Sequence, residues 1–154
     1  DLSEADIRWA ELCIFKRAYR MIREKGYPSK MLMCSMRISP PMNDGSAASW
    51  HIEKIAGSNV VYTCPPSYIS DLMNVEDKLK PFNSEAIHED APQATMKKLL
   101  QIPYFVQAYE PEGMTKDEFN KQGALVATAA EFSKATRATV DFVAQQFQAM
   151  GKKI

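Results

Sequence analysis

Two side chains near the end of an apolar run have the chemistry to bind an anion. The run is Lys30-Met-Leu-Met-Cys-Ser-Met-Arg37, and it predicts a strand over Met31–Met36. Residues two apart on a strand face the same side, so Ser35 and Arg37 project together. A hydroxyl and a guanidinium side by side suit a phosphate, because one supplies a single donor and the other a charged fork.

This pair has two interpretations. In a parallel sheet, the carboxyl end of a strand is where ligands bind in both open α/β sheets and barrels. Ser35 and Arg37 then predict an anion site, bordered by the loop Ile38–Gly45 that follows them. Alternatively, Arg37 makes a structural ion pair or lies at a solvated strand end. The residues alone leave both interpretations open.

The elements around this run predict an α/β fold. Apolar residues, among them Ile7, Ile14 and Phe15, recur every three or four positions from Ser3 to Lys25 and form one predicted buried face. This pattern predicts a helix that Ser3 or Asp1 caps and that ends before Gly26. The predicted elements that follow the strand are a short helix over Ser46–Ala56, a strand over Val60–Thr63 and a short helix from Ser67 through Met73. Two short strands joined through a helix imply parallel pairing.

The second half of the chain is predicted to be mainly helical. A helix over Asp90–Leu100 precedes an extended segment over Ile102–Gly113, which is rich in aromatic residues and proline. Thr115 and Glu118 form a capping box. A long amphipathic helix of about 25 to 30 residues follows, bent at Gly123. Its apolar stripe consists of Leu125, Ala129, Phe132, Thr136, Val140, Val143 and Phe147.

Composition limits the function classes. The chain has 154 residues, 45% of them apolar, and its 19 basic and 19 acidic residues balance. This balance argues against a nucleic-acid partner, because phosphate backbones require a basic excess. Partnership with a membrane is not expected either, since no apolar run reaches the ~18 residues of a span. Cys13, Cys34 and Cys64 are predicted to be buried free thiols, which fits the cytoplasm.

Several other residues could take part in binding, but each also has a simpler structural explanation. His51 follows the Arg37 loop and is either close to a bound phosphate or a partly exposed helix residue. His88 lies in an acidic run, but no second imidazole at ligand spacing accompanies it, so no metal is predicted. The remaining candidates are aromatic residues that either cover a cleft and stack on a sugar or fix their segment to the fold: Tyr104, Phe105 and Tyr109.

The order of these motifs resembles the C-terminal part of a transaldolase. In that family an aromatic helix ends in Lys-x-Gly-Tyr before the seventh barrel strand, and this chain has Phe15 to Tyr19 followed by Glu24-Lys-Gly-Tyr27. The family strand ends in a small residue, Ser, an aromatic and Arg, which Cys34-Ser-Met-Arg37 matches. Ile55-Ala-Gly-Ser-Asn59 and Val60–Thr63 resemble the family's next helix end and eighth strand. The family's usual Asn after the arginine is Ile38 here, and Pro40-Pro41 makes the loop more elaborate.

The resemblance implies a fold and an activity. The fold would be α/β, a partial (β/α)8 TIM-barrel-like C-terminal half that is helix-rich with two short parallel strands. Residues 1–154 would form one segment of it, with 1–74 as helix, strand, helix, strand, helix and 75–154 as the mainly helical C-terminal region. The activity would be transfer between phosphorylated sugars by a Schiff-base mechanism of the pentose phosphate pathway type, without a cofactor. Ser35 and Arg37 would hold the substrate phosphate.

The catalytic residues of the family find no match in this chain. The Schiff-base lysine and its acid and base partners lie on earlier barrel strands, so no catalytic residue is assigned here. Lys30 would lie at the wrong end of the barrel, whereas Lys97 and Lys98 are predicted to be solvated on a helix. We therefore expect this chain alone to be inactive.

Length supports the same expectation. A complete barrel of this type takes ~250 residues, and the chain opens on Asp1. Three explanations remain: a proteolytic fragment, a piece of a longer protein whose N-terminal half is missing, or a truncated form that covers its surfaces by self-association. The alternative function is a non-catalytic sugar-phosphate-binding or oligomeric interaction protein that keeps a transaldolase-like half-fold.

Overall fold

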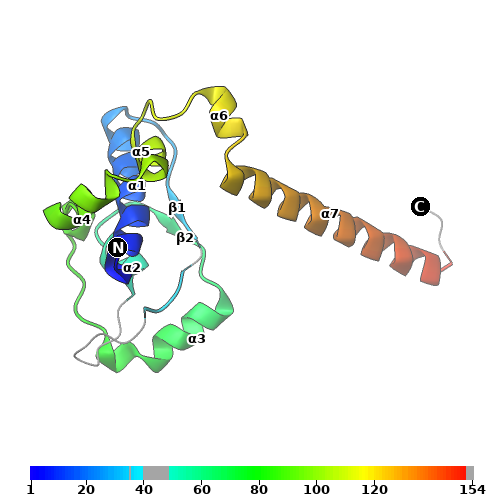
Figure 1. Ribbon diagram of the computed structural model, residues 1–154. Helices are drawn as coiled ribbons and strands as arrows, with labels where there is room; N and C mark the ends of the chain where they lie inside the picture. The colour runs from blue at the N-terminus through cyan, green and yellow to red at the C-terminus, as the bar shows by residue number, and fades with distance from the viewer. Residues whose placement is uncertain (35, 40–48, 152–154) are drawn as a thin grey trace. The chain divides into compact units, whose positions relative to one another are not determined.

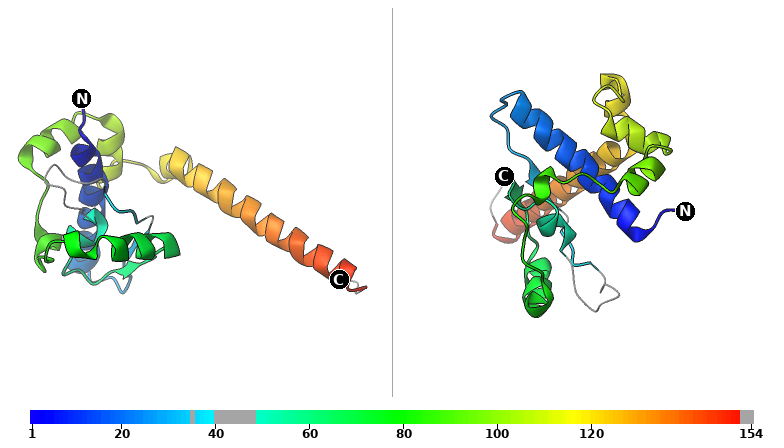
Figure 2. Two further views of the ribbon diagram at one scale, coloured as in Figure 1. Left: turned by 90° about the horizontal axis from the view of Figure 1, so that it is seen from below. Right: turned by 90° about the vertical axis from the view of Figure 1, so that its left-hand side faces the viewer.

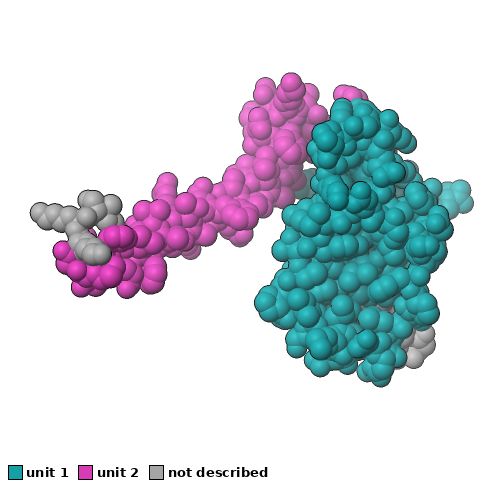
Figure 3. All heavy atoms as spheres, turned by 180° about the vertical axis from the view of Figure 1, so that it is seen from behind, with its two compact units in different colours: residues 1–110 teal, residues 111–154 magenta. Residues whose placement is uncertain are grey.

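The computed structural model describes residues 1–34, 36–39 and 49–151. The chain forms two compact units, Asp1–Glu110 (unit 1) and Pro111–Ile154 (unit 2), which Figure 3 shows in separate colours. The boundary of the compact units therefore lies after Glu110, whereas the two regions expected from the resemblance meet at residue 74.

Helix α1 (Glu4–Glu24) opens unit 1, as the sequence predicts. Ser3 caps it through a capping box, because its hydroxyl accepts the Asp6 amide at 3.2 Å while the Asp6 carboxylate accepts the Ser3 amide at 2.9 Å. The helix is followed by Gly26, whose φ of 64° lies in the left-handed region that glycine adopts without strain. The predicted start and end of this helix are confirmed.

The buried face of α1 overlaps the predicted one only in part, since Phe15 is buried and Ala10 and Ile14 are partly buried against the core. The prediction placed Ile7 on the buried face, but this side chain is 58% exposed and lines a shallow apolar groove of about 240 Å³ with α4 and α5. The buried face includes two charged residues, Asp6 and Lys16, whose polar groups are paired. Because the predicted apolar pattern left out Asp6 and Lys16, it indicated a face next to the one that is most buried. The buried residues of α1 are Asp6, Trp9, Leu12, Cys13, Phe15, Lys16 and Tyr19.

Two short parallel strands form the sheet of unit 1. Strand β1 (Leu32–Met33) pairs with β2 (Val61–Tyr62) in the register Leu32 to Val61 and Met33 to Tyr62. Helix α2 (Trp50–Glu53) lies between them in the chain. The parallel pairing is confirmed, but both strands are shorter than predicted. Unit 1 is thus α/β in the coarse sense, and the described residues are predominantly helical (Figure 1).

The chain after β2 contains helix α3 (Pro66–Asn74) and two 3-10 turns, Glu76–Lys78 and Ala86–His88. Helix α3 confirms the predicted helix, although Pro65 rather than Ser67 occupies its N-cap position. The second 3-10 turn lies against the chain that follows α2, as shown by the hydrogen bond from the Ile87 amide to the Ala56 carbonyl at 3.2 Å.

Helices α4 (Gln93–Leu99) and α5 (Pro103–Tyr109) both contact α1 (Figures 1 and 2). The extended conformation predicted for Ile102–Gly113 is wrong. Pro103 occupies the first turn of α5, where no amide donor is needed. Phe105 is buried and stacks on Tyr109 with ring centroids 5.2 Å apart. These two aromatic residues therefore fix their segment to α1, which is one of the two roles predicted for them.

The core of unit 1 joins α1 to the sheet and to the later helices. Its most enclosed apolar side chains, each exposed by 1% or less, are Leu12, Ile55, Ile87 and Leu99. The other buried apolar members are Trp9, Cys13, Phe15, Tyr19, Met33, Met36, Tyr68, Ala86 and Phe105. Cys13 is buried as predicted, whereas Cys34 and Cys64 are exposed. All three cysteines are free.

Unit 2 consists of α6 (Lys116–Asn120) and α7 (Gly123–Ala149). The predicted capping box is present at α6, with the Thr115 amide donating to Glu118 at 2.8 Å. Helix α7 begins at Gly123 and is not bent there (Figure 2). It has no buried residue, and several side chains of its apolar stripe are exposed, for example Phe132 at 69% and Val140 at 61%. In the part of the chain that the structure describes, no helix combines the length and apolarity that crossing a membrane requires.

Candidate functional site

The predicted anion site lies at the carboxyl end of the β1–β2 pair. Met36 and Cys64 follow the two strands, and the Cys64 Sγ lies 3.8 Å from the Met36 Sδ. The chain segments that leave β1 and β2 are therefore adjacent at this end. Arg37 comes next and is exposed. Ser35 lies outside the described residues, as does the loop Ile38–Gly45 beyond Ser39.

The strand on which the pairing of Ser35 and Arg37 depended is shorter than predicted. Strand β1 ends at Met33, so period-two geometry ends before residue 35. Cys34 is exposed and Met36 is buried, although a continuing strand would place these two on one face. The shared face of Ser35 and Arg37 stays a prediction.

Arg37 has an electrostatic effect on Glu11 of α1. The Glu11 carboxylate lies 3.3 Å from the His51 Nε2. The hydrogen bond from His51 lowers the pKa of Glu11 against the opposing effect of burial, and the charges of His51, Arg8 and Arg37 lower it further. Arg37 is therefore near enough to contribute to stabilising this carboxylate. Among the described residues, Arg37 makes no ion pair within 4 Å.

Two buried polar atoms near the ends of the 40–48 segment have no hydrogen-bond partner among the described residues. They are the Ser39 Oγ and the His51 Nδ1. His51 is 6% exposed, so the partly exposed histidine predicted as its simpler role is wrong. Buried polar atoms are normally paired, and those that lack protein partners are available to a ligand or water.

A hydrogen bond between two hydroxyls joins the start of α2 to α3. Ser49 is fully buried, and its hydroxyl and that of Tyr68 on α3 are hydrogen-bonded. The Ser49 amide donates to the Glu53 carboxylate at 2.8 Å. Burial raises the pKa of Tyr68, and the Ser49 hydrogen bond opposes that rise. Both hydroxyls therefore stay protonated at neutral pH and fix α2 against α3.

Sequence reasoning missed one buried amine, that of Lys16 on α1. This residue is 2% exposed, and its Nζ donates to the carbonyls of Ala86 and Glu89 at 2.6 and 2.7 Å. Burial lowers the pKa of Lys16 to about 8. Its position four residues after Leu12 and three before Tyr19, on the buried face of α1, is the signal that could have revealed it.

Lys16 lies beside a pocket of about 390 Å³ formed with α4 and α5. An amine with a lowered pKa in a pocket has the properties of a nucleophile. Here, however, two carbonyls hold its protons and the face of Trp9 lies 5.2 Å away. The contacts are those of a cation that ties α1 to the chain at 86–89, so we assign Lys16 a structural role.

The sequence offered three other candidate lysines: Lys30, Lys97 and Lys98. Lys30 is exposed and precedes β1, at the amino end of the strands. Lys97 is exposed on α4. Lys98 is not merely solvated, because its Nζ donates to the buried Asp6 carboxylate at 2.7 Å. Within the described ranges, no three His, Cys, Asp or Glu residues lie together as a metal site would require.

Comparisons with known proteins add no assignment. No family model matches the chain, and neither the curated proteins nor the solved structures contain a significant match. The functional interpretation therefore depends on the residues and their geometry.

Proposed function

We propose that this chain is the phosphate-binding, C-terminal part of a transaldolase-like transferase of phosphorylated sugars. The observation that carries the proposal is the position of Arg37. It is an exposed guanidinium four residues beyond the last residue of β1, at the carboxyl end of two parallel strands. Ligands of parallel α/β folds bind at this end. The element order helix, strand, helix, strand, helix also agrees with the resemblance.

In this proposal Arg37 binds the phosphate through a charged fork, with Ser35 as a further donor. Glu11 offsets part of the guanidinium charge in the unliganded state. None of the lysines discussed above fits a Schiff-base role: Lys16 is held by carbonyls, Lys98 by Asp6, and Lys30 lies at the amino end. The Schiff-base lysine and its proton-transfer partners would therefore belong to chain upstream of Asp1.

Arg37→Ala tests the proposal in the protein that includes the upstream half. We expect affinity for a phosphorylated sugar to fall by about 1.5–3 kcal/mol, the usual contribution of a hydrogen bond to a charged group, with little change for the dephosphorylated analogue. Arg20→Ala is the matched control, because Arg20 is an α1 arginine paired with Asp90. Equal losses for both ligands would show that Arg37 is structural.

The intact mass of the native polypeptide tests the enzyme proposal independently. A longer parent chain whose lysine is reduced onto a ketose phosphate by borohydride would support it. A native polypeptide of only these residues, with no lysine that borohydride traps, would exclude it.

A second candidate function is a non-catalytic sugar-phosphate-binding or interaction protein. The observation that favours it is α7, which has 27 residues and buries none of them. Sedimentation of the native protein tests it, because an assembly module is expected to self-associate through the α7 stripe. The three free thiols support the cytoplasm as the proposed location of either form.

A further inference from the structure

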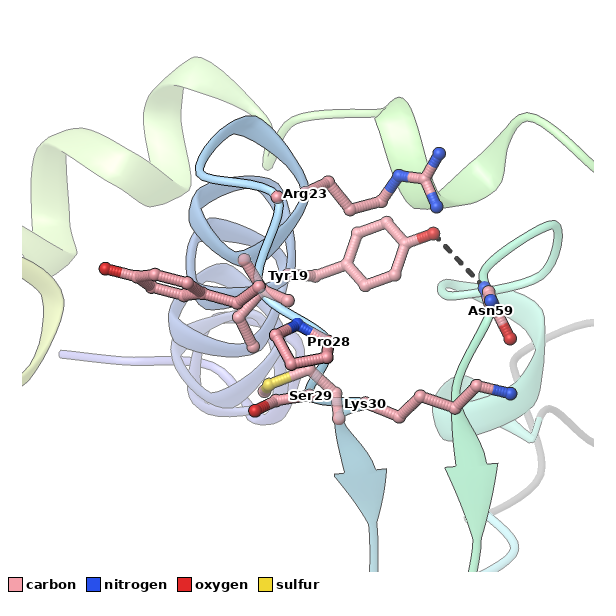
Figure 4. Close-up of a pocket in the computed structure, with 10 residues that line it drawn as sticks. Tyr19, Arg23, Pro28, Ser29, Lys30 and Asn59 are labelled. Atoms are coloured by element: carbon pink, nitrogen blue, oxygen red, sulfur yellow. Dashed lines mark hydrogen bonds between the residues drawn. The ribbon is translucent and has the colours of Figure 1, made fainter.

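The amino ends of β1 and β2 border a pocket of about 330 Å³ that the proposed function does not use. We call it the amino-end pocket. It is formed by the last turns of α1, the turn that leads to β1, and the residue two before β2 (Figure 4). Its lining residues are Tyr19, Ile22, Arg23, Gly26, Tyr27, Pro28, Ser29, Lys30, Met31 and Asn59.

The charge of this lining is entirely positive. Arg23 and Lys30 are its two charged residues, and none of the ten is acidic. The other arginines of α1 are all neutralised, because Arg8, Arg17 and Arg20 pair with Glu4, Glu110 and Asp90. Arg23 and Lys30, in contrast, make no ion pair with any residue that the structure describes. Two uncompensated cations in one pocket favour an anionic ligand.

Hydrogen-bond donors accompany the two cations. The Tyr19 Oη accepts the Asn59 backbone amide at 3.1 Å, which leaves its own hydroxyl proton to donate. Figure 4 shows this hydroxyl between the guanidinium of Arg23 and the side chain of Asn59, with the Lys30 ammonium on the same side. Because Tyr19 is only 7% exposed, its hydroxyl is held in place.

We propose that the amino-end pocket binds a phosphate-type oxyanion, through Arg23, Lys30 and the Tyr19 hydroxyl. A guanidinium, an ammonium and a hydroxyl together match the several acceptor oxygens of such a group. This site is at the opposite end of the strands from Arg37, so it does not depend on the proposed function. The competing role of Arg23 is to offset the negative end of the α1 dipole, and the experiment separates the two roles.

The probes are sodium phosphate, a phosphomonoester such as glycerol phosphate, and sodium chloride at equal ionic strength. Binding is followed in proton–nitrogen correlation spectra of the whole chain through the Asn59 and Lys30 amides. We expect both phosphate probes, and not chloride, to shift these amides with saturation. Tighter binding of the ester would identify a phosphorylated small molecule as the ligand, and equal binding would identify free phosphate; both results support the site.

Arg23→Gln and Lys30→Gln should each weaken phosphate binding about tenfold, the effect of removing one charged hydrogen-bond donor. Lys25→Gln is the matched control, because its ammonium lies 6.0 Å from the Tyr27 ring and outside the pocket lining. We expect it to change the affinity less than twofold. Equal loss in all three variants would indicate a diffuse positive field and would overturn the proposal. Unchanged binding in Arg23→Gln with a less stable α1 would also overturn it.

Discussion

Helices α1 and α7 have similar apolar periodicity in sequence and very different surroundings in the structure. Helix α1 has 21 residues and buries seven of them, whereas α7 has 27 residues and buries none. The α1 face receives groups from several other elements, among them α2, α4, α5, β1 and the 86–89 turn. Apolar periodicity thus identifies a face that is able to pack, but the partner has to come from elsewhere in the chain or from another molecule.

The comparison also shows that charged residues behave differently in the two helices. All four charged residues of α7, Glu131, Lys134, Arg137 and Asp141, are exposed and lie away from its apolar stripe. In α1, Asp6 and Lys16 lie on the buried face with their polar groups paired. A charged residue on a packed face is stable only when the neighbouring elements supply its partners. That condition is met in α1 alone.

The largest expected effect on stability comes from replacing one leucine by alanine in each helix and comparing the two losses. Leu12→Ala should lower the free energy of unfolding of unit 1 by about 2–5 kcal/mol, because it leaves a cavity in the core. Leu125→Ala should change it by less than about 0.5 kcal/mol, since this side chain is exposed. Urea titration followed by tryptophan fluorescence reports unit 1 specifically, because both tryptophans, Trp9 and Trp50, lie in it. A comparable loss in Leu125→Ala would mean that α7 packs on unit 1.

A smaller effect is expected from the pH dependence of Lys16. Its pKa is about 8 in the folded chain and 10.5 ordinarily, so between these values the unfolded chain holds a proton that the folded chain has lost. Unfolding then takes up a proton, so the contribution of Lys16 to stability rises with pH across this window, by at most about 3 kcal/mol. The raised pKa values of Cys13, Tyr62 and Tyr68 lower stability with rising pH in the same window, so the test is the difference between the native protein and Lys16→Met. Above pH 8 the urea midpoint of the native protein should gain on that of Lys16→Met. Lys134→Met on α7 is the control, and an equal pH dependence in the native protein and Lys16→Met would contradict the assignment.

The smallest effect is expected at acidic pH, from Asp6. The hydrogen bond from Lys98, together with those from Ser3 and Thr95, holds the pKa of this carboxyl well below its ordinary value of 3.8. Below that value the unfolded chain binds the proton first, so stability falls as the pH falls. Asp6→Asn should reduce this slope in the tryptophan-detected midpoint. Glu118→Gln removes the other capping-box carboxylate, in unit 2, and should leave the slope unchanged.

Much of the local structure could be predicted from the sequence because local chemistry determines it. Ser3 and Thr115 cap their helices through neighbours three residues away, and Gly26 ends α1. The helix at α5 was missed because proline and aromatic residues suggested an extended segment. Its stability comes instead from packing of Phe105 and Tyr109, including the Arg17 guanidinium 4.2 Å from the Tyr109 ring.

The candidate sites were less predictable, because they depend on residues far apart in the chain. Arg37 was identified from its position at a strand end, yet Glu11, a carboxylate whose pKa it helps to lower, is 26 positions earlier. Lys16 was missed because its carbonyl partners lie 70 and 73 residues later. The amino-end pocket needs Tyr19 and Asn59 together, and these residues are 40 positions apart with no local signal of their contact.

The contact between Gly57 and the chain near Ser84 has a consequence for sequence variation. Gly57 has a φ of 83°, and a Cβ at this position would overlap the backbone carbonyl of Ser84. The fold therefore needs glycine at position 57 but only a peptide group at position 84. In a library of random variants selected for folding, position 57 should remain glycine while position 84 accepts many residue types. Two positions in direct contact would thus differ greatly in their tolerance of mutation.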